Sequence, residues 1–95
     1  MASYRLTEAA KEDLWRIYQY GVVQFGEAQA DSYFNALFER FGQIADNPML
    51  YPSVDYIRAG YRRSVCGVDS IFYRIMDDTV EIISILSRQD IDRIL

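Results

Sequence analysis

The N-terminal third of the chain has the residue spacing of one amphipathic helix. Residues 4–6 form a short strand candidate, and Thr7 after them is a suitable helix N-cap. Apolar or small residues then recur on one side of a helix at Ala10, Leu14, Ile17, Tyr18, Gly21 and Phe25. Gly26 directly after this series predicts the end of the helix.

A second helical pattern follows at once and ends at a proline. Its apolar side comprises Ala30, Phe34, Leu37, Phe38, Phe41, Ile44 and Ala45. Because a proline disfavours helix in the residue before it, Pro48 predicts that this helix ends at residues 46–48. Two helices joined at Gly26 predict an antiparallel hairpin. Residues 48–55, which have two prolines and no helical period, are expected to form a loop.

Beyond this loop the pattern changes to strands. Segments 61–65, 70–76 and 79–86 are rich in β-forming residues. The links at residues 66–69 and 77–78 predict two hairpins. Ser87-Arg88-Gln89-Asp90 is typical of a cap that leads into a short last helix, residues 90–95. Strands that are separated from helices in this way predict one α+β domain, with the helical hairpin on one face of a mostly antiparallel sheet.

Size and composition limit the class of protein. The 95 residues are enough for a single domain, 1–95, and the hydrophobic share of 51% is that of a folded globular protein. The N-terminus shows no secretory signal, and no apolar run approaches the roughly 18 residues that span a bilayer. With one cysteine and no histidine, a disulfide within the chain is impossible and a zinc site is disfavoured. The expectation is a cytoplasmic protein without metal, cofactor or membrane partner.

Positive charge gathers in one part of this acidic chain. The formal net charge is −4, yet residues 57–75 contain four arginines: Arg58, Arg62, Arg63 and Arg74. Because side chains alternate along a strand, Arg62 and Arg63 must point to opposite faces. One should lie under or beside the helices and meet a helix carboxylate or carbonyl. The other should reach the open face, together with Arg74 or Arg58.

These arginines have two interpretations. They either hold a small sheet together through ion pairs, or they form a recognition surface for an acidic or phosphate-bearing partner. An acidic chain lacks the basic footprint of a non-specific nucleic-acid binder. No direct binding of nucleic acid is therefore expected.

No group of residues in the sequence forms a recognisable catalytic site. A Ser-His-Asp triad is ruled out by the absence of histidine, and Cys66 is expected to be an incidental buried or half-buried thiol. The glycine pattern of a phosphate-binding loop is also missing. Three acids at the start of the first helix, Glu8, Glu12 and Asp13, are expected to form a solvated turn that complements the helix dipole.

Two aromatic residues of the first helix are candidates for a protein interface. Trp15 and Tyr18 are three positions apart and therefore neighbours on the helix surface. Partly exposed aromatic side chains act as anchors in interfaces. The alternative is that both residues pack in the core.

Together these segments resemble the ParE branch of the RelE/ParE superfamily of bacterial toxin–antitoxin modules. YRLTEAAKEDLWRIYQY is similar to the family's first strand and helix, and FGEAQADSYFNALFERFGQIADNP to its second helix. The most specific segment is IRAGYRRSVCGVDSIFYRI, with its R-x-G-Y-R and F-Y-R-I motifs, followed by VEIISILSRQDIDRIL. The similarity covers nearly the whole chain and implies a RelE/ParE-like fold.

The resemblance also implies a function. A ParE-type toxin inhibits DNA gyrase without enzymatic turnover of its own, and a tightly bound ParD-like antitoxin neutralises it in a hetero-oligomer assembled through antitoxin dimerisation. The target-binding candidates are Arg58, Arg62, Arg63, Arg74 and Arg88, the last together with the C-terminal segment. The antitoxin-binding candidates are Trp15, Tyr18, Tyr61, Arg62 and Arg74.

Two alternative functions stay open. RelE-type relatives cut messenger RNA on the ribosome, which requires a general base, a general acid and cations. Those relatives commonly use lysines and arginines in the sheet with a tyrosine or histidine near the C-terminus, whereas here the only lysine is Lys11, on the first helix, and no tyrosine follows Tyr73. The nuclease is therefore the second choice. The other alternative is a non-toxic relic that only binds its antitoxin.

Overall fold

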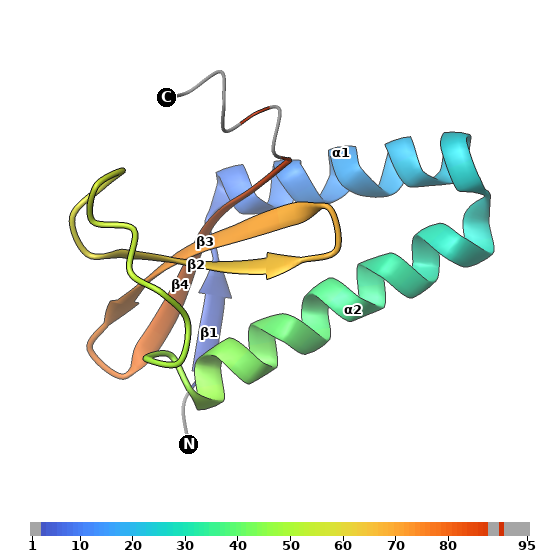
Figure 1. Ribbon diagram of the computed structural model, residues 1–95. Helices are drawn as coiled ribbons and strands as arrows, with labels where there is room; N and C mark the ends of the chain where they lie inside the picture. The colour runs from blue at the N-terminus through green and yellow to red at the C-terminus, as the bar shows by residue number, and fades with distance from the viewer. Residues whose placement is uncertain (1–2, 88–89, 91–95) are drawn as a thin grey trace.

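The computed structural model describes residues 3–87 and 90 and consists of two helices packed on a four-stranded sheet (Figure 1). The elements in chain order are β1 (Ser3–Leu6), α1 (Glu8–Phe25), α2 (Glu27–Asp46), β2 (Tyr61–Cys66), β3 (Asp69–Met76) and β4 (Thr79–Ser87). The α+β class and the element order are as predicted, and each strand end lies within one residue of its predicted position. The short helix expected at residues 90–95 lies outside the described residues, apart from Asp90.

Local sequence signals determine where α1 begins and where it gives way to α2. The hydroxyl oxygen of Thr7 accepts the N–H of Ala10 at 3.0 Å, which caps α1. Gly26 ends α1 with a φ of 93°, a conformation that residues with a Cβ avoid, and α2 begins at the next residue. The resulting hairpin extends well beyond the sheet at its Gly26 end (Figure 1).

The sheet has the strand order β1-β4-β3-β2 and is mixed. β1 runs parallel to β4, whereas β4, β3 and β2 are joined in antiparallel fashion by two-residue turns. β1 has only four residues and pairs with β4 from Thr79 to Ile82. Among the residues that the structure describes, the second half of β4 therefore has no strand neighbour on that side.

The main core lies between the helices and one face of the sheet. Its fully buried residues are Ala10, Leu37, Phe41, Ile44, Ile71, Tyr73, Ile82 and Ile85. Tyr73 is the largest of them, and its hydroxyl donates to the carbonyl oxygen of Pro48 at 2.6 Å. A buried phenol needs such a partner because an unpaired hydroxyl in the core is costly.

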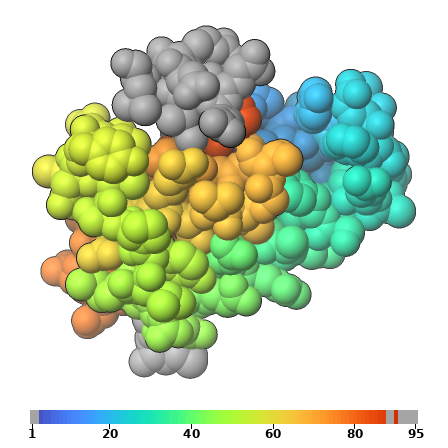
Figure 2. All heavy atoms as spheres, in the orientation of Figure 1, coloured from blue at the N-terminus to red at the C-terminus, as the bar shows by residue number. Residues whose placement is uncertain are grey.

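The loop of residues 47–60 covers part of the opposite sheet face. Val54 from this loop and Phe72 from β3 are 3% and 4% exposed and form a second, smaller cluster with Ile57, Tyr61 and Leu86. The N–H of Val54 donates to the carbonyl oxygen of Tyr61 at 2.8 Å. Figure 2 shows the yellow-green loop lying directly against the gold and orange strands of the β2–β3 hairpin. The face without helices is therefore only partly open.

Across residues 3–87 and 90, no helix is both long and apolar enough to cross a membrane. Nor does this part of the chain gather three or more histidine, cysteine or acidic side chains that could hold a metal ion.

Gly67 in the β2–β3 turn lies against the ring of Tyr33, and we expect Gly67→Ala to lower the free energy of unfolding by about 2 kcal/mol. A Cβ at this position would lie 2.5 Å from Cε1 of Tyr33, and the backbone φ is +61°. The Tyr33 hydroxyl donates to the Cys66 carbonyl oxygen at 2.9 Å and to Asp69 at 2.7 Å. The ring therefore cannot move aside without losing these bonds.

The control for this substitution is Gly60→Ala. Gly60 also has a positive φ, +84°, but a Cβ at this position would meet no neighbouring side chain or backbone atom within 4 Å. Its loss in stability should therefore be the backbone penalty alone, about 1 kcal/mol. Urea unfolding of both variants measures the difference, and equal losses would contradict a contact between Gly67 and Tyr33.

Candidate binding surfaces

Arg62 and Arg63 point to opposite faces of β2, as predicted from the alternation of side chains. Arg62 shares the helix side of the strand with the buried residues Ser64 and Cys66, and its Nη1 donates to the carbonyl oxygen of Tyr51 at 2.7 Å. The expectation of a partner on a helix is wrong. The 47–60 loop, which forms a β-bridge between Ser53 and Arg62, lies beside this edge of the sheet and supplies the carbonyl.

Three other candidate arginines lie on the open face, the sheet face opposite the helices. Arg63 donates from Nε to the hydroxyl oxygen of Ser70 at 2.8 Å. Arg74 donates from Nε to Glu81 at 2.7 Å. Arg58 lies over the ring of Tyr61, with its guanidinium carbon 5.8 Å from the ring centroid. Arg62 is not part of this group, and Arg88 lies outside the described residues.

Trp15 and Tyr18 form a stacked pair on α1. Their ring centroids are 6.4 Å apart and their planes differ by 16°. The Tyr18 hydroxyl donates to Asp31 at 2.6 Å, which raises its pKa, and its ring packs edge-on against Phe34. Trp15 is 61% exposed, so the core alternative is wrong for this residue. The pair lies on the helical hairpin, whereas Tyr61 and Arg74 lie on the open face, so the antitoxin-binding candidates do not form one patch.

A groove of about 800 Å³ runs between α1, α2 and the β2–β3 turn. Tyr18 lines it, and so do three exposed apolar residues: Tyr20, Phe25 and Val68. Phe25 was expected on the core side of its helix but is 60% exposed, because the hairpin tip extends beyond the sheet (Figure 1). Exposed apolar side chains that rim a groove are typical of a protein interface.

Buried titratable groups lie at one end of this groove. Asp69 is 5% exposed, accepts the hydroxyl of Tyr33 and has its pKa raised by burial. Burial likewise raises the pKa of the neighbouring Cys66 thiol. A buried thiol with a raised pKa is a poor nucleophile, which agrees with the expectation of an incidental cysteine.

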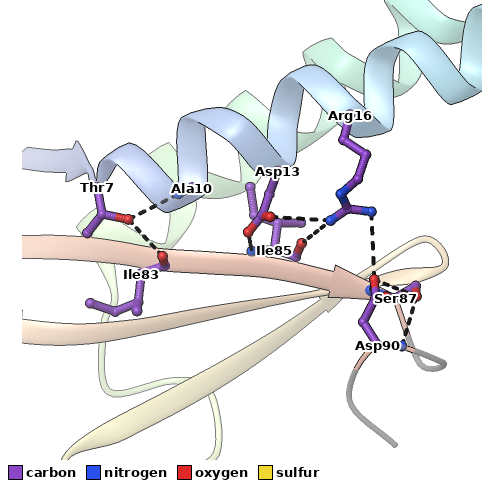
Figure 3. A network of polar contacts seen from close by, with 8 residues as sticks. All are labelled: Thr7, Ala10, Asp13, Arg16, Ile83, Ile85, Ser87 and Asp90. Atoms are coloured by element: carbon purple, nitrogen blue, oxygen red, sulfur yellow. Dashed lines mark hydrogen bonds and ion pairs between the residues drawn. The ribbon is translucent and has the colours of Figure 1, made fainter. Parts of the chain in front are cut away.

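Side chains of the N-terminal part of α1 complete β4 where β1 ends (Figure 3). Thr7 donates its hydroxyl to the carbonyl oxygen of Ile83 at 2.7 Å. Asp13 accepts the N–H of Ile85 at 2.9 Å, and Arg16 binds both Asp13 and the Ile85 carbonyl oxygen. The expectation of a solvated carboxylate is therefore wrong for Asp13, which replaces a missing strand as partner of β4.

The same contacts continue to the start of the C-terminal segment. The N–H of Asp90 donates to the Ser87 hydroxyl oxygen, and the Ser87 N–H donates back to the Asp90 carboxylate, each at 3.2 Å. This reciprocal arrangement is the hydrogen-bond pattern of a capping box, whereas the helix predicted to follow it lies outside the described residues. Arg16 lies 3.7 Å from the Asp90 carboxylate and links the cap to α1 (Figure 3).

A helical hairpin on one face of a mixed sheet, with arginines on the other face, is the arrangement that the resemblance to the RelE/ParE superfamily predicts. Residues 4–92 match the family model described as ParE toxin of type II toxin-antitoxin system, parDE. The chain therefore belongs to this family, and the resemblance seen in the sequence is confirmed.

Individual relatives agree with this assignment. The chain is 38% identical over 86 residues to Toxin ParE1 of Caulobacter vibrioides, covering 90% of this chain and 88% of the relative. Its fold is similar to a chain of the chromosomal ParDE TA system from P. aeruginosa, with a TM-score of 0.79 and 23% identity over 92% of this chain and 96% of the other. A chain of the RelBE2 toxin–antitoxin complex from Mycobacterium tuberculosis has a TM-score of 0.61 and 24% identity, with coverage of 92% and 98%.

Proposed function

We propose that this ParE-family toxin inhibits DNA gyrase in the cytoplasm and does so by binding, without turning over a substrate. The observation that carries the proposal is the family membership of residues 4–92. The open face adds support, because its cations are arginines and the single lysine of the chain, Lys11, lies on α1. Messenger-RNA cleavage would need a general acid and a general base close to these cations.

The tyrosines do not supply that pair. Tyr73 is completely buried on the helix side of the sheet, its hydroxyl is held by Pro48, and burial raises its pKa to about 12. Tyr61 lies on the open face, but its ring packs in the second cluster and under Arg58. The chain has no histidine to replace them. This supports a target-binding role for the open face rather than ribonuclease chemistry.

We assign target contacts to Arg58, Arg63 and Arg74, which share the open face. Arg62 remains a candidate at the edge of the sheet, where its exposed fraction is intermediate. Arg88, outside the described residues, remains a candidate together with the C-terminal segment.

The proposed inhibitor of the toxin is a ParD-like antitoxin that dimerises and thereby builds a hetero-oligomer. The groove beside Tyr18, on whose ring Trp15 stacks, is the surface best suited to an apolar antitoxin segment. The toxin-antitoxin systems named for both similar structures support a protein partner of this kind. Tyr61, Arg62 and Arg74 would contact it only if the antitoxin also reached around the sheet.

A gyrase assay on the free toxin tests the proposal. Purified toxin should inhibit DNA supercoiling by gyrase, or stabilise its cleaved-DNA complex, and addition of the antitoxin encoded beside it should reverse the effect. Unchanged supercoiling at micromolar toxin would reject gyrase as the target. Toeprinting of a translated message in parallel would reveal new cuts at the ribosomal A site if the toxin acts as a ribonuclease instead.

A further inference from the structure

A row of side chains crosses the open face at right angles to the strands. Strand register places Arg5 of β1 opposite Glu81 of β4, Glu81 opposite Arg74 of β3, and Arg74 opposite Tyr61 of β2. Arg58 extends the row because it lies over the Tyr61 ring. We call these five residues the arginine row.

One carboxylate holds two guanidinium groups in this row. Arg5 approaches Oε2 of Glu81 through Nη2 at 2.9 Å and Nε at 3.1 Å, while Arg74 binds Oε1 through Nε at 2.7 Å. The hydrogen bond from Arg74 is the main cause of the lowered pKa of Glu81. Glu81 therefore stays ionised and keeps both arginines in place at neutral pH.

The arginines, and not the carboxylate, face the solvent. The side chains of Arg5 and Arg74 are 58% and 44% exposed, whereas that of Glu81 is 12% exposed. Arg74 donates to Glu81 through Nε, and within residues 3–87 and 90 its two terminal nitrogens donate no hydrogen bond, so they are available as a two-pronged donor. With Arg58, the row carries three positive charges and one negative charge.

We propose that the arginine row binds carboxylates of an acidic segment on the toxin's target protein, and that Glu81 is a positioning residue that orients Arg5 and Arg74 for this contact. The inference deepens the proposed function, on which it rests. It adds Arg5 to the target-binding residues and assigns a role to Glu81.

The arrangement of charges favours a polypeptide over a nucleic acid. A polynucleotide that crossed the row would bring phosphates close to Glu81 as well as to the arginines. A polypeptide places a carboxylate at Arg5 and another at Arg74 and leaves a neutral residue over Glu81. The overall charge of −4 also lacks the basic footprint that supplies most of the affinity for nucleic acid.

Glu81 has two opposing effects on an acidic ligand. Its charge repels the ligand, but this interaction is weak in the high dielectric at a protein surface. Its hydrogen bonds also fix two long side chains, which would otherwise lose rotamer freedom when the ligand binds. For arginine, this entropic cost is larger than the repulsion between Glu81 and the ligand. Glu81→Gln should therefore weaken binding even though it makes the row more positive.

Fluorescence anisotropy with three labelled probes tests the row directly. The probes are a peptide of glutamates separated by serine pairs, the same peptide with glutamine in place of glutamate, and single-stranded DNA with the same number of charges. Wild-type toxin should bind the glutamate peptide more tightly than the other two. Arg5→Gln and Arg74→Gln should each lower that affinity about tenfold, the value of one charge-assisted hydrogen-bonded pair.

Three further variants separate geometry from charge. Glu81→Gln should lower the affinity about threefold, because side-chain ordering outweighs repulsion. Arg74→Lys should behave like Arg74→Gln, since an ammonium group cannot reproduce the planar fork. Lys11→Ala removes an equal charge from α1, where Lys11 pairs with Glu8, and should change the affinity less than about twofold.

Circular dichroism and thermal unfolding check that each variant is folded. Should the loss of Arg5 or Arg74 unfold the sheet, Arg58→Gln replaces them, because Arg58 contacts the Tyr61 ring from a loop. Tighter binding by Glu81→Gln would overturn the positioning role. Preference for DNA, or unchanged affinity in all arginine variants, would overturn the acidic polypeptide as ligand.

The same variants in the gyrase assay and in a pull-down of the antitoxin identify the source of the acidic segment. If wild-type toxin inhibits gyrase and the Arg5 and Arg74 variants inhibit it equally well, the arginine row is not the target contact although the proposed function holds. If wild-type toxin leaves gyrase unaffected but binds the glutamate peptide as expected, the gyrase assignment fails while the row's recognition of carboxylates stands. Loss of antitoxin binding with intact toxicity would assign the row to the antitoxin and overturn the inference.

Discussion

Trp15→Ala is expected to weaken binding of the antitoxin by about 30-fold or more, the effect of removing an aromatic interface anchor. Trp15 is exposed, yet it stacks on Tyr18, which is itself fixed by Asp31 and Phe34. A ring that is held in place before binding loses little conformational freedom when a partner covers it. The partner in this prediction is the proposed antitoxin.

Titration calorimetry with purified antitoxin measures this effect, and Tyr56→Ala is the matched control. Tyr56 is 77% exposed in the 47–60 loop and does not line the groove, so its removal should change the affinity less than about twofold. Trp15 is the only tryptophan of the chain, and its emission should shift to shorter wavelength when the antitoxin covers it. An unchanged affinity for Trp15→Ala would place the antitoxin on another surface.

The elements of this fold could be predicted because their signals are local. The apolar spacing in each helix, Gly26 between the helices and the short turns between strands depend on residues close in sequence. Thr7 is a local signal too, and the structure confirms it as the N-cap of α1. The pairing of β1 with β4 is different, since it joins residues about 76 positions apart and no local pattern predicts it.

The candidate site was therefore predicted only in part. Separation of Arg62 from Arg63 follows from the pleat of one strand, and the structure confirms it. Arg5 was missed because its partner Glu81 becomes a neighbour only through the β1–β4 pairing. Phe25 was misplaced because helical periodicity continues past the end of the sheet, where no strand remains to bury it.

Asp13 is the residue whose structural role differs most from the role that the sequence predicts. As one of several acids at the start of a helix, it has the sequence pattern of a solvated first turn. Its partner is instead the N–H of Ile85, in the half of β4 that has no neighbour from β1 because β1 pairs only as far as Ile82. The sequence would have predicted this role only if the pairing of β1 with β4 had been known, because β1 is shorter than β4 and leaves part of β4 unpaired on that side.

Asp13→Ala is expected to lower the free energy of unfolding by about 3 kcal/mol, since it leaves the Ile85 N–H without its acceptor beside a buried side chain. It also removes the ion pair between Asp13 and Arg16, whose Oδ1 and Nη2 atoms are 3.3 Å apart and which holds Arg16 beside β4. Urea or thermal unfolding measures the loss. Glu8→Ala, which alters an 86% exposed side chain of the same helix, should cost about 0.5 kcal/mol or less.

Asp13→Asn separates the two roles of the carboxylate. Asparagine keeps a side-chain oxygen that can accept the Ile85 N–H but gives up the ion pair with Arg16. Because that ion pair is half exposed on the Arg16 side, its loss alone should cost about 1 kcal/mol or less. A loss as large as that of Asp13→Ala would mean that charge, and not completion of β4, is what Asp13 contributes. Similar stability of Asp13→Ala and Glu8→Ala would show that water satisfies Ile85 and that the second half of β4 needs no partner from α1.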